Sequence, residues 1–342
     1  MATFSQWANV LRARMRRDRA KDWHNPANVT LLDTAMGSEN SGDWVIMAAC
    51  DEACRDMFGS KELQHVATHY YSEELEHLSG RVKLLCGTNI LYTHMADQKQ
   101  WALPHDLRSF DHVCLLGVGM SDIGVDDCID AYTKAFYKTV LDGELFHSVR
   151  DEMTRQRLLD IGITNVLNTA CPTMWSLTPE VQANIPVQKA SCVLTSITDY
   201  SFSPERDLEM LKILGREYEK VTIWVQGSHD IDWCLDKIVD LSSYEVVGPN
   251  IEDLDRVLKR SDLDYVGTRL HAGIRCLNRG HRSLIIAVDN RARQIGADTG
   301  LPVLEREELS SGKLEEWINH PVPSDIRLPW DAINQWKDQF RR

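Results

Sequence analysis

The sequence predicts an α/β protein with two domains, each built on a parallel β-sheet. Its 342 residues are enough for two domains of ordinary size. Short apolar runs alternate with longer stretches of helical periodicity, and glycines follow several of the runs, as they do where crossover helices join parallel strands. Pro172, Pro179 and Pro186 interrupt this alternation, which then restarts. We therefore expect a division near residues 180–188.

Each half of the chain contains a series of expected strands and helices. In the first half, strands are predicted at 29–32, 82–86 and 112–116, and helices at 44–57, 126–140 and 151–161. In the second half, strands are predicted at 192–195, 221–225, 246–247, 265–267 and 284–288, and helices at 204–218 and 324–342. The expected organisation is a basic amino-terminal helix over 1–26, a first domain over 27–183, and a second domain over 184–342 that ends in an amphipathic helix.

The composition excludes several classes of protein. With 43% hydrophobic and 26% charged residues, the chain is globular rather than disordered. No run approaches the roughly 18 apolar residues that a membrane-spanning helix needs. The 38 Lys and Arg against 51 Asp and Glu give a net charge of -13, which disfavours nucleic acid as a partner but leaves room for a basic pocket that binds a small anion.

The nine cysteines are scattered along the chain. They form no CxxC pair and no close Cys/His spacing, so we expect no metal site. Cys50 and Cys54 are four residues apart in an expected helix, where buried thiols are favoured over a metal or redox pair. An odd, dispersed set of cysteines fits the reducing cytosol.

The first 22 residues have the pattern of a basic amphipathic helix and lack a secretory signal. Phe4, Trp7, Leu11 and Met15 fall on one stripe. The basic residues around the stripe are Arg12, Arg14, Arg16, Arg17, Arg19 and Lys21. One hypothesis is a helix that lies on an anionic membrane surface. The favoured alternative is a helix packed on the body of the protein or on a second subunit, and a transit peptide is disfavoured because the stretch is poor in Ser.

Two loops that follow expected strands are candidate ligand contacts. The first consists of Asn40, Ser41, Gly42 and Asp43. Its backbone N–H groups and the helix N-terminus suit an anion or a sugar hydroxyl, whereas the simpler interpretation is that Asp43 caps the helix. The second contains Gly117 and Gly119, which do not form the GxGxxG pattern of dinucleotide sites and predict close backbone approach at a strand end.

Three charged residues near expected strand ends are candidates for chemistry. Arg150 beside Asp151 suits either a structural ion pair or a guanidinium fork for a carboxylate or phosphate. His271 begins an expected helix, a position that favours a lowered pKa and proton exchange near neutrality, although a hydrogen-bonded core histidine is the commoner case. Arg291 places a cation at the end of a later strand, and a solvated surface arginine is again the simpler interpretation.

Together, and in this order, these segments resemble the polysaccharide pyruvyl transferase family. The resemblance covers roughly residues 28–300. Its seven motifs are 40–43 (the family's N-x-G-D loop), 85–91 (a glycine-rich element with Gly87 and Thr88), 116–120 (G-v-G), 148–151 (S-x-R-D), 170–173 (D/C-P), 268–272 (R-L-H) and 287–291 (Y-D-x-K). Cys86 and Asn89 stand where glycines are common, Val288 stands for Tyr, and Arg291 for Lys.

The resemblance implies a glycosyltransferase-B-like fold, in which two Rossmann-like domains face each other across a cleft. It also implies the transfer of pyruvate from phosphoenolpyruvate onto two hydroxyls of a sugar, which makes a cyclic ketal. The acceptor would be a sugar of a polysaccharide or of a lipid-linked saccharide, in exopolysaccharide biosynthesis. The family's chemistry implies no redox cofactor.

The same resemblance suggests roles for individual residues. Arg150 and Arg291 would hold the trianionic donor from opposite cleft walls, and His271 would act as general acid and base. Arg269 would either bind phosphate or brace its helix, and bracing is favoured. The other expected substrate-binding residues are Asn40, Ser41, Gly42, Asp43, Gly87, Thr88, Gly117 and Gly119.

Two other functions stay open at this point. A sugar-nucleotide-dependent glycosyltransferase of the same fold would need a carboxylate for the ribose in the second domain, and Glu252 is available. A non-catalytic glycan-binding relative would be consistent with the departures at Cys86 and Arg291. For the transferase we expect a cytoplasmic location, with peripheral contact to the inner face of the membrane through residues 1–22.

Overall fold

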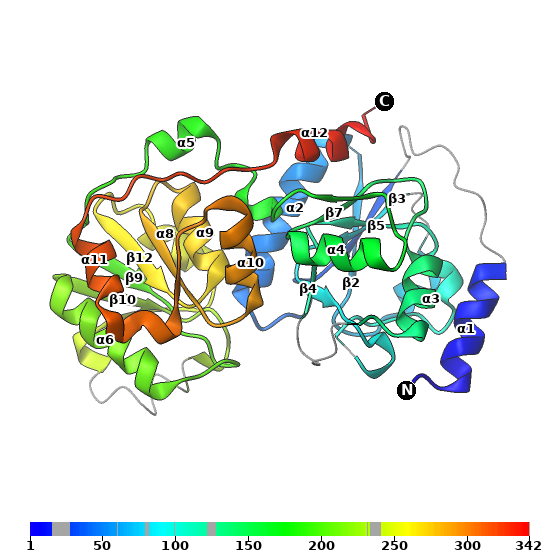
Figure 1. Ribbon diagram of the computed structural model, residues 1–342, viewed down its shortest axis with the longest axis horizontal. Helices are drawn as coiled ribbons and strands as arrows, with labels where there is room; N and C mark the ends of the chain where they lie inside the picture. Colours follow the sequence, from blue (N-terminus) through cyan, green and yellow to red (C-terminus); the bar gives the residue numbers. More distant parts are fainter. Residues whose placement is uncertain are drawn as a thin grey trace. The chain divides into compact units, whose positions relative to one another are not determined.

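The computed structural model describes residues 1–15, 28–59, 61–78, 82–98, 100–121, 128–230, 232 and 241–341. The chain forms two compact units, each with its own parallel sheet (Figure 1). Unit 1 comprises Met1–Ser38, Ile46–Pro172 and Leu328–Arg342, and unit 2 comprises Glu39–Val45 and Thr173–Arg327.

The main sheet of unit 1 has four parallel strands in the order β2-β1-β3-β5. The strands are β1 (Val29–Asp33), β2 (Leu63–Ala67), β3 (Val82–Cys86) and β5 (Val113–Leu116). Every residue of β1, β3 and β5 is buried, as expected of parallel strands covered on both faces. Their mostly apolar runs are therefore the sequence signature of a sheet interior.

Short strands and helices complete unit 1. The strands are β4 (Asn89–Leu91), β6 (Gly119–Met120), β7 (His147–Val149) and β8 (Val166–Asn168). The helices are α1 (Phe4–Met15), α2 (Ser41–Phe58), which begins among the residues of unit 2, α3 (Ala131–Val140), α4 (Glu152–Asp160) and α12 (Trp330–Asp338). Aromatic side chains form the centre of the core, where Trp101 lies between Phe110 and Phe136.

Unit 2 contains a six-stranded sheet in the order β11-β10-β9-β12-β13-β14, and the strand pairs run parallel. The strands are β9 (Cys192–Thr195), β10 (Lys220–Trp224), β11 (Glu245–Val247), β12 (Leu263–Gly267), β13 (Ser283–Ala287) and β14 (Val303–Glu305). The helices are α5 (Pro179–Ala183), α6 (Pro204–Glu217), α8 (Ile251–Val257), α9 (Leu270–Asn278), α10 (Asn290–Thr299) and α11 (Lys313–Asn319).

Two separate cores cover the faces of this second sheet. Val193 packs in a core with residues of α6 and α11, and its neighbour Leu194 packs in another with residues of α8 and α9. Successive side chains of a strand point to opposite faces, so this division follows from the pleat. Because both faces of the sheet are covered, the polar loops of unit 2 lie at the ends of its strands. Short 3-10 helices lie at Glu73–His77, Met95–Asp97, Leu107–Phe110, Pro172–Met174, Leu241–Ser243 and Arg306–Ser311.

The predicted strands and helices are present, within a few residues, wherever the structure describes them. Predicted helix residues 16–26, 126, 127 and 342 lie outside the described residues. The predicted helix 324–342 is shorter in the structure, where α12 spans Trp330–Asp338. Strand β2 was not predicted, because Gln64 and His65 break its apolar pattern. The remaining unpredicted strands have two to three residues, too few for periodicity to appear.

The unit boundaries differ from the predicted domains at three places. The change from unit 1 to unit 2 comes at Pro172–Thr173, earlier than the predicted residue 183. Residues 39–45 cluster with unit 2, and the terminal helix α12 clusters with unit 1, where it contacts β7 and β8. Trp336 of α12 is fully buried there, so the apolar stripe of the tail was correctly recognised but its location was not.

The amino-terminal helix packs on unit 1, which was the favoured hypothesis. Its buried residues are Val10 and Ala13, and Trp7 makes an edge-to-face contact with Tyr132 of α3. The basic residues of 16–21 lie outside the described residues. Among the helices the structure describes, none is long and apolar enough to cross a membrane.

Candidate functional site

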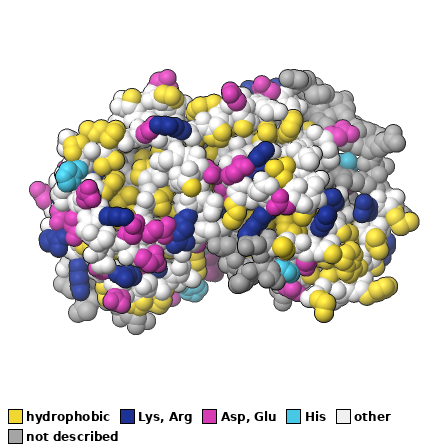
Figure 2. Space-filling model, viewed as in Figure 1, with side chains coloured by type: hydrophobic (Ala, Val, Ile, Leu, Met, Phe, Trp, Pro, Cys, Tyr) yellow, Lys and Arg dark blue, Asp and Glu magenta, His cyan; other side chains and the backbone are white. Residues whose placement is uncertain are grey.

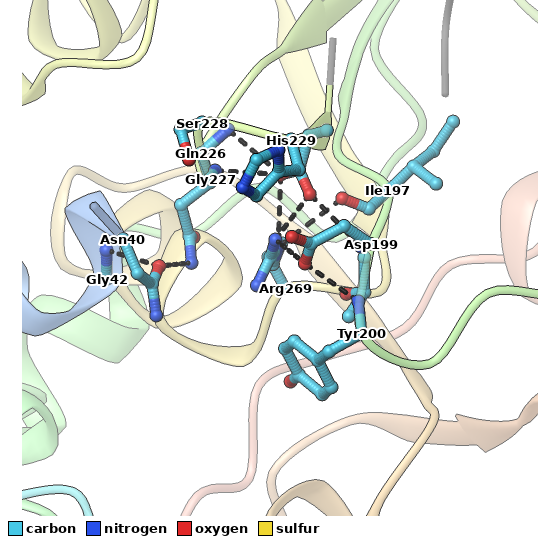
Figure 3. A network of polar contacts seen from close by, with 12 residues as sticks. Asn40, Gly42, Ile197, Asp199, Tyr200, Gln226, Gly227, Ser228, His229 and Arg269 are labelled. Atoms are coloured by element: carbon cyan, nitrogen blue, oxygen red, sulfur yellow. Dashed lines mark hydrogen bonds and ion pairs between the residues drawn. The ribbon is translucent and has the colours of Figure 1, made fainter. Parts of the chain in front are cut away.

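The carboxyl ends of the strands of unit 2 gather most of the predicted site residues. The loops after β9, β10, β12 and β13 meet at this edge of the sheet, and the segment 39–45 joins them (Figure 3). Ligands of parallel α/β sheets bind at this edge. The structure places Asn40, Ser41, Gly42, Asp43, Arg269, His271 and Arg291 in unit 2.

Arg269 is the centre of a polar network at this edge. Its side chain is 3% exposed, and it begins helix α9 directly after β12. Nη2 donates to Asp199 Oδ1 at 2.9 Å and to Asp230 Oδ1, while Nε donates to Asp230 Oδ2 at 3.2 Å and to the Ile197 carbonyl at 3.3 Å. These contacts are those of a brace, the role the sequence interpretation favoured.

Asp230 ties the loop after β10 to this brace. Its Oδ2 accepts hydrogen bonds from the backbone N–H groups of Gln226 (3.2 Å) and Gly227 (2.8 Å), and its Oδ1 accepts from Asp199 N at 3.1 Å. Burial raises the pKa of Asp230, and the Arg269 guanidinium opposes the rise. The Asp230 carboxylate therefore connects its own loop after β10, the loop after β9 at Asp199, and the Arg269 side chain.

The Asn40–Asp43 loop packs against the same region. Asn40 Oδ1 accepts from Gly42 N at 3.0 Å and from Gln226 Nε2 at 2.8 Å, and Ser41 N donates to the Gln226 carbonyl at 3.0 Å. A Cβ on Gly42 would lie 2.6 Å from Gln226 Nε2, so a larger residue there would have to displace the Gln226 side chain. Asp43 is buried in the first turn of α2. In this structure the loop is built into unit 2 by contacts with Gln226.

Arg291 lies at the start of α10 beside an exposed aromatic ring. Nε donates to Asp289 Oδ2 at 2.9 Å, and Asp289 also caps the helix by accepting from Arg291 N. Tyr200 donates its hydroxyl to Asp289 at 3.0 Å, and its ring lies 5.3 Å from the Arg291 guanidinium and 5.2 Å from that of Arg269. The Arg291 side chain is 18% exposed, so Arg291 presents more of its charge to solvent than Arg269 does.

His271 follows one residue after the start of α9 and is 4% exposed. It lies in the same short segment as Arg269, just beyond the end of β12. Glu252, the candidate ribose ligand of the alternative function, is exposed in the first turn of α8, whose N-cap is Asn250. Glu252 therefore has the position of an ordinary acidic residue in the first turn of a helix, where the helix dipole favours a negative charge.

A second cluster lies at strand ends in unit 1 and is centred on Arg150. This side chain is fully buried, and Nη2 donates to Asn89 Oδ1. Asp151 Oδ2 lies 3.5 Å from Nε, while its Oδ1 caps α4 by accepting from Thr154 N at 2.7 Å. Nε and Nη1 of Arg150 have no hydrogen-bond partner.

Glycines make room for this buried guanidinium. A Cβ on Gly119 would lie 2.4 Å from Arg150 Nε, so the guanidinium rests directly on the backbone of β6. Gly117 has φ +66°, and a Cβ there would lie 2.1 Å from Pro172 Cδ. Both positions confirm the predicted close backbone approach. Gly87 also allows a close approach, because a Cβ there would meet the Ile46 side chain. The Thr88 carbonyl accepts a hydrogen bond from Gly119 N at 2.9 Å.

Most of the described cysteines are buried thiols, whereas Cys128 is exposed and Cys192 half-buried. Cys50, Cys54 and Cys86 are buried, and burial is the main cause that raises the pKa of Cys54 and Cys86. Cys86 thus fills a packed position in β3. Within the described ranges, no group of three or more His, Cys, Asp or Glu side chains is placed to hold a metal ion.

Sequence analysis did not identify Asp199, Tyr200, Gln226 and Asp230 as site residues. They follow the predicted strands 192–195 and 221–225, so their place at a strand end was readable, but nothing local shows that one arginine collects both acids. A strand-end position was the available signal. The sequence does not show which residues these strand-end residues contact.

Comparison with known proteins agrees with this geometry. Two solved structures of UDP-GlcNAc 2-epimerase from Methanocaldococcus jannaschii resemble the chain. The one in complex with UDP-GlcNAc and UDP has a TM-score of 0.56 at 10% identity over 91% of this chain and 98% of that one. The other has a TM-score of 0.51 at 10% identity over 87% and 95%. The likeness concerns the fold, and it confirms the glycosyltransferase-B-like α/β class with its two Rossmann-like units.

No curated protein matches the chain. The family model of polysaccharide pyruvyl transferase matches residues 40–290, which include every predicted site residue except Arg291. This span is most of the chain and contains residues of both strand-end clusters. The chain therefore belongs to the polysaccharide pyruvyl transferase family, a family of transferase enzymes.

Proposed function

We propose that the protein transfers pyruvate from phosphoenolpyruvate onto two hydroxyls of one sugar, in a polysaccharide or a lipid-linked saccharide of exopolysaccharide biosynthesis. Membership of the family supports the reaction class. The structural observation that carries the choice of an anionic donor is the state of Arg150, whose buried guanidinium leaves two N–H-bearing atoms without a partner.

A buried guanidinium with unsatisfied N–H groups lowers stability, even when a carboxylate lies nearby, as Asp151 does here. A buried donor without a partner costs about 1–3 kcal/mol, and more when it belongs to a charged group. Among the described arginines, Arg282 and Arg306 each leave Nε alone without a partner, whereas Arg150 leaves both Nε and Nη1. An anion that binds there would satisfy both atoms and the charge. Low polarity around the buried group strengthens that attraction.

Arg291 is the second proposed contact for the donor. It replaces the lysine of the family motif, but keeps a cation at the start of α10, where the helix N-terminus also favours an anion. Asp289 and Tyr200 hold its guanidinium from one side and leave part of it exposed. Phosphoenolpyruvate carries a phosphate and a carboxylate, and a guanidinium suits either of these groups.

The proposed chemistry balances without a redox step. One acceptor hydroxyl attacks C2 of the donor while the methylene carbon takes a proton and becomes a methyl group. The C2–O bond to phosphate then breaks, and the second hydroxyl forms the second C–O bond of the ketal. The two hydroxyl protons end on the methyl carbon and on the released phosphate. His271 is the proposed general acid and base that moves them.

Asn40, Ser41, Gly42, Asp43, Gly87 and Thr88 remain proposed substrate contacts, through the strand-end loops that they occupy. Gly117 and Gly119 serve the site by their lack of a side chain, since each allows another group to approach the backbone. The location that we propose with this activity is the cytoplasm, in peripheral contact with the inner face of the membrane.

A ligand-induced shift of the melting temperature tests the donor without knowledge of the acceptor. A ligand that binds only the folded state stabilises it by about 2.7 kcal/mol at one hundred times its Kd. We expect phosphoenolpyruvate to raise Tm, and pyruvate or inorganic phosphate at equal concentration to raise it less. Uridine diphosphate is the parallel ligand. A shift with uridine diphosphate and none with phosphoenolpyruvate would replace the proposed reaction by glycosyl transfer.

A further inference from the structure

Helix α1 turns three of its four large stripe residues away from the protein, while the fourth, Trp7, packs against Tyr132. Phe4 is 90% exposed, Leu11 54% and Met15 86%. These three residues fall on one stripe of the helix, because they are seven and four positions apart. An amphipathic helix of a soluble domain normally buries such a stripe. Here these three residues lie on the outer face.

The opposite face of α1 is held firmly on unit 1. Val10 is fully buried in the core of that unit, and Gln6 Nε2 donates to the Ala96 carbonyl at 3.2 Å. Asn9 donates to the His105 carbonyl at 2.9 Å and accepts from Leu107 N at 3.2 Å. The side chains that fix the helix are therefore Val10, the polar Gln6 and Asn9, and the ring of Trp7 against Tyr132. The orientation of the apolar stripe follows from these contacts.

Positive charge surrounds the exposed stripe. Arg12 and Arg14 lie on the same helix, and residues 1–15 contain no Asp or Glu. The chain as a whole has a net charge of -13, so this end is electrostatically unlike the remainder. Figure 2 shows apolar and basic side chains side by side in the region of α1, at the lower right of the view.

We propose that the surface formed by Phe4, Leu11, Met15, Arg12 and Arg14, here called the α1 surface, docks on an anionic lipid bilayer. The three apolar side chains would enter the interface, and the two arginines would contact lipid phosphates. This proposal rests on the peripheral membrane contact given under the proposed function and names the surface that makes it. Docking needs neither donor nor acceptor, so it can fail or succeed independently of pyruvyl transfer.

Charge favours a bilayer over a second copy of the chain. In a two-fold symmetric contact through α1, the arginines of both copies would gather at one interface and repel each other. On an anionic bilayer the same charges are attracted, and each basic residue near such a surface contributes about 1 kcal/mol. Exposed apolar side chains flanked by basic ones are typical of interfacial helices.

Sedimentation with lipid vesicles tests this proposal on the full-length protein. We expect binding to vesicles that contain phosphatidylglycerol, weaker binding to pure phosphatidylcholine, and loss of binding at high salt. The triple variant Phe4→Ser/Leu11→Ser/Met15→Ser should lose at least roughly tenfold in partition, as should Arg12→Glu/Arg14→Glu. Val246→Ser is the matched control, because Val246 is 40% exposed on unit 2.

The substituted side chains are exposed, so each variant should keep the wild-type Tm, which is measured alongside. Binding of the triple variant to anionic vesicles at wild-type strength would overturn the proposal. So would a wild-type protein that ignores vesicles but forms a dimer that the triple variant loses in analytical ultracentrifugation. That outcome would assign the α1 surface to self-association.

Discussion

Arg150 and Arg269 are two buried arginines in similar places with opposite surroundings. Both lie near the ends of parallel strands, and both side chains are at most 3% exposed. Arg269 donates to two carboxylates and a carbonyl through Nε and Nη2. Arg150 donates to one amide oxygen and has Asp151 Oδ2 3.5 Å from Nε, and its Nε and Nη1 have no hydrogen-bond partner.

The difference shows how to tell a structural arginine from one prepared for a ligand. Burial alone does not separate them, and neither does position at a strand end. What separates them is whether the donors are already satisfied. On this criterion Arg269 has the contacts of a structural residue and Arg150 is the one proposed to bind an anion, so substitutions should affect stability in one case and binding in the other.

The largest expected effect is on stability. Arg269→Met leaves Asp230 buried without its counterion, and breaking a buried pair in this way costs about 3–5 kcal/mol. Urea unfolding should show this loss in the transition of unit 2. Arg293→Met is the control, because Arg293 pairs with Glu305 on the surface and should change the unfolding free energy by less than about 1 kcal/mol. Equal effects of the two substitutions would contradict the assignment of Arg269 as a brace.

The second effect separates binding from stability. Arg150→Lys keeps a positive charge beside Asp151 but removes the planar set of donors. We expect the stabilisation by phosphoenolpyruvate to fall to a small part of its wild-type value, while unfolding without ligand changes by less than the about 3–5 kcal/mol expected for Arg269→Met. Differential scanning calorimetry with and without the donor measures both quantities. A large loss of stability with an unchanged ligand response would make Arg150 a second brace.

A smaller effect is expected at Tyr200. Its hydroxyl and ring hold Asp289 and Arg291, so Tyr200→Phe removes one hydrogen bond from the support of that cation. A hydrogen bond to a charged group contributes about 1.5–3 kcal/mol, of which Arg291 would feel a fraction, so the Kd for phosphoenolpyruvate should rise a fewfold. Tyr71→Phe, which removes an exposed hydrogen bond to Glu76 in unit 1, should leave the Kd unchanged.

The smallest effect concerns pH. The hydrogen bond to Asp33, 2.7 Å long, raises the pKa of His65 despite partial burial. A raised folded-state pKa means that the contribution to stability is fully present below the ordinary value of about 6.5 and is lost as pH rises through the folded value. The Tm of wild type should therefore decline across this window, and His65→Gln should flatten the decline. A profile that the substitution does not change would assign the pH dependence to other groups.

Much of the fold was predictable because each sheet leaves a strong local trace. The buried runs of β1, β3, β5 and β9 appear as short, mostly apolar segments, and the order of helices and strands follows from them. Strand β2 was not predicted because Gln64 and His65 interrupt its apolar pattern. The location of α12 was not predicted because it depends on contacts with β7 and β8, which are far away in sequence. Local sequence patterns therefore predict helices and strands, but they do not predict which other elements these pack against.

The candidate site was predictable in the same partial sense. Motif positions placed Arg150, Arg269, His271 and Arg291 near strand ends, where they are found. Their physical states were not predictable, because they depend on Asp199 and Asp230 in one case and on Asn89 in the other. For α1, the hydrophobic stripe was recognised, but only the structure shows that Phe4, Leu11 and Met15 point outward while Trp7 packs on unit 1.

Calorimetric titration of phosphoenolpyruvate into wild type, Arg150→Lys and Arg306→Lys tests the central claim most directly. Arg306 is another buried arginine, but it pairs with Asp207 in unit 2 and serves as the matched control. The account predicts that wild type and Arg306→Lys bind the donor, and that Arg150→Lys binds at least about tenfold more weakly because its donors no longer match an anion. Equal affinity in all three proteins, or no binding by the wild type, would contradict it.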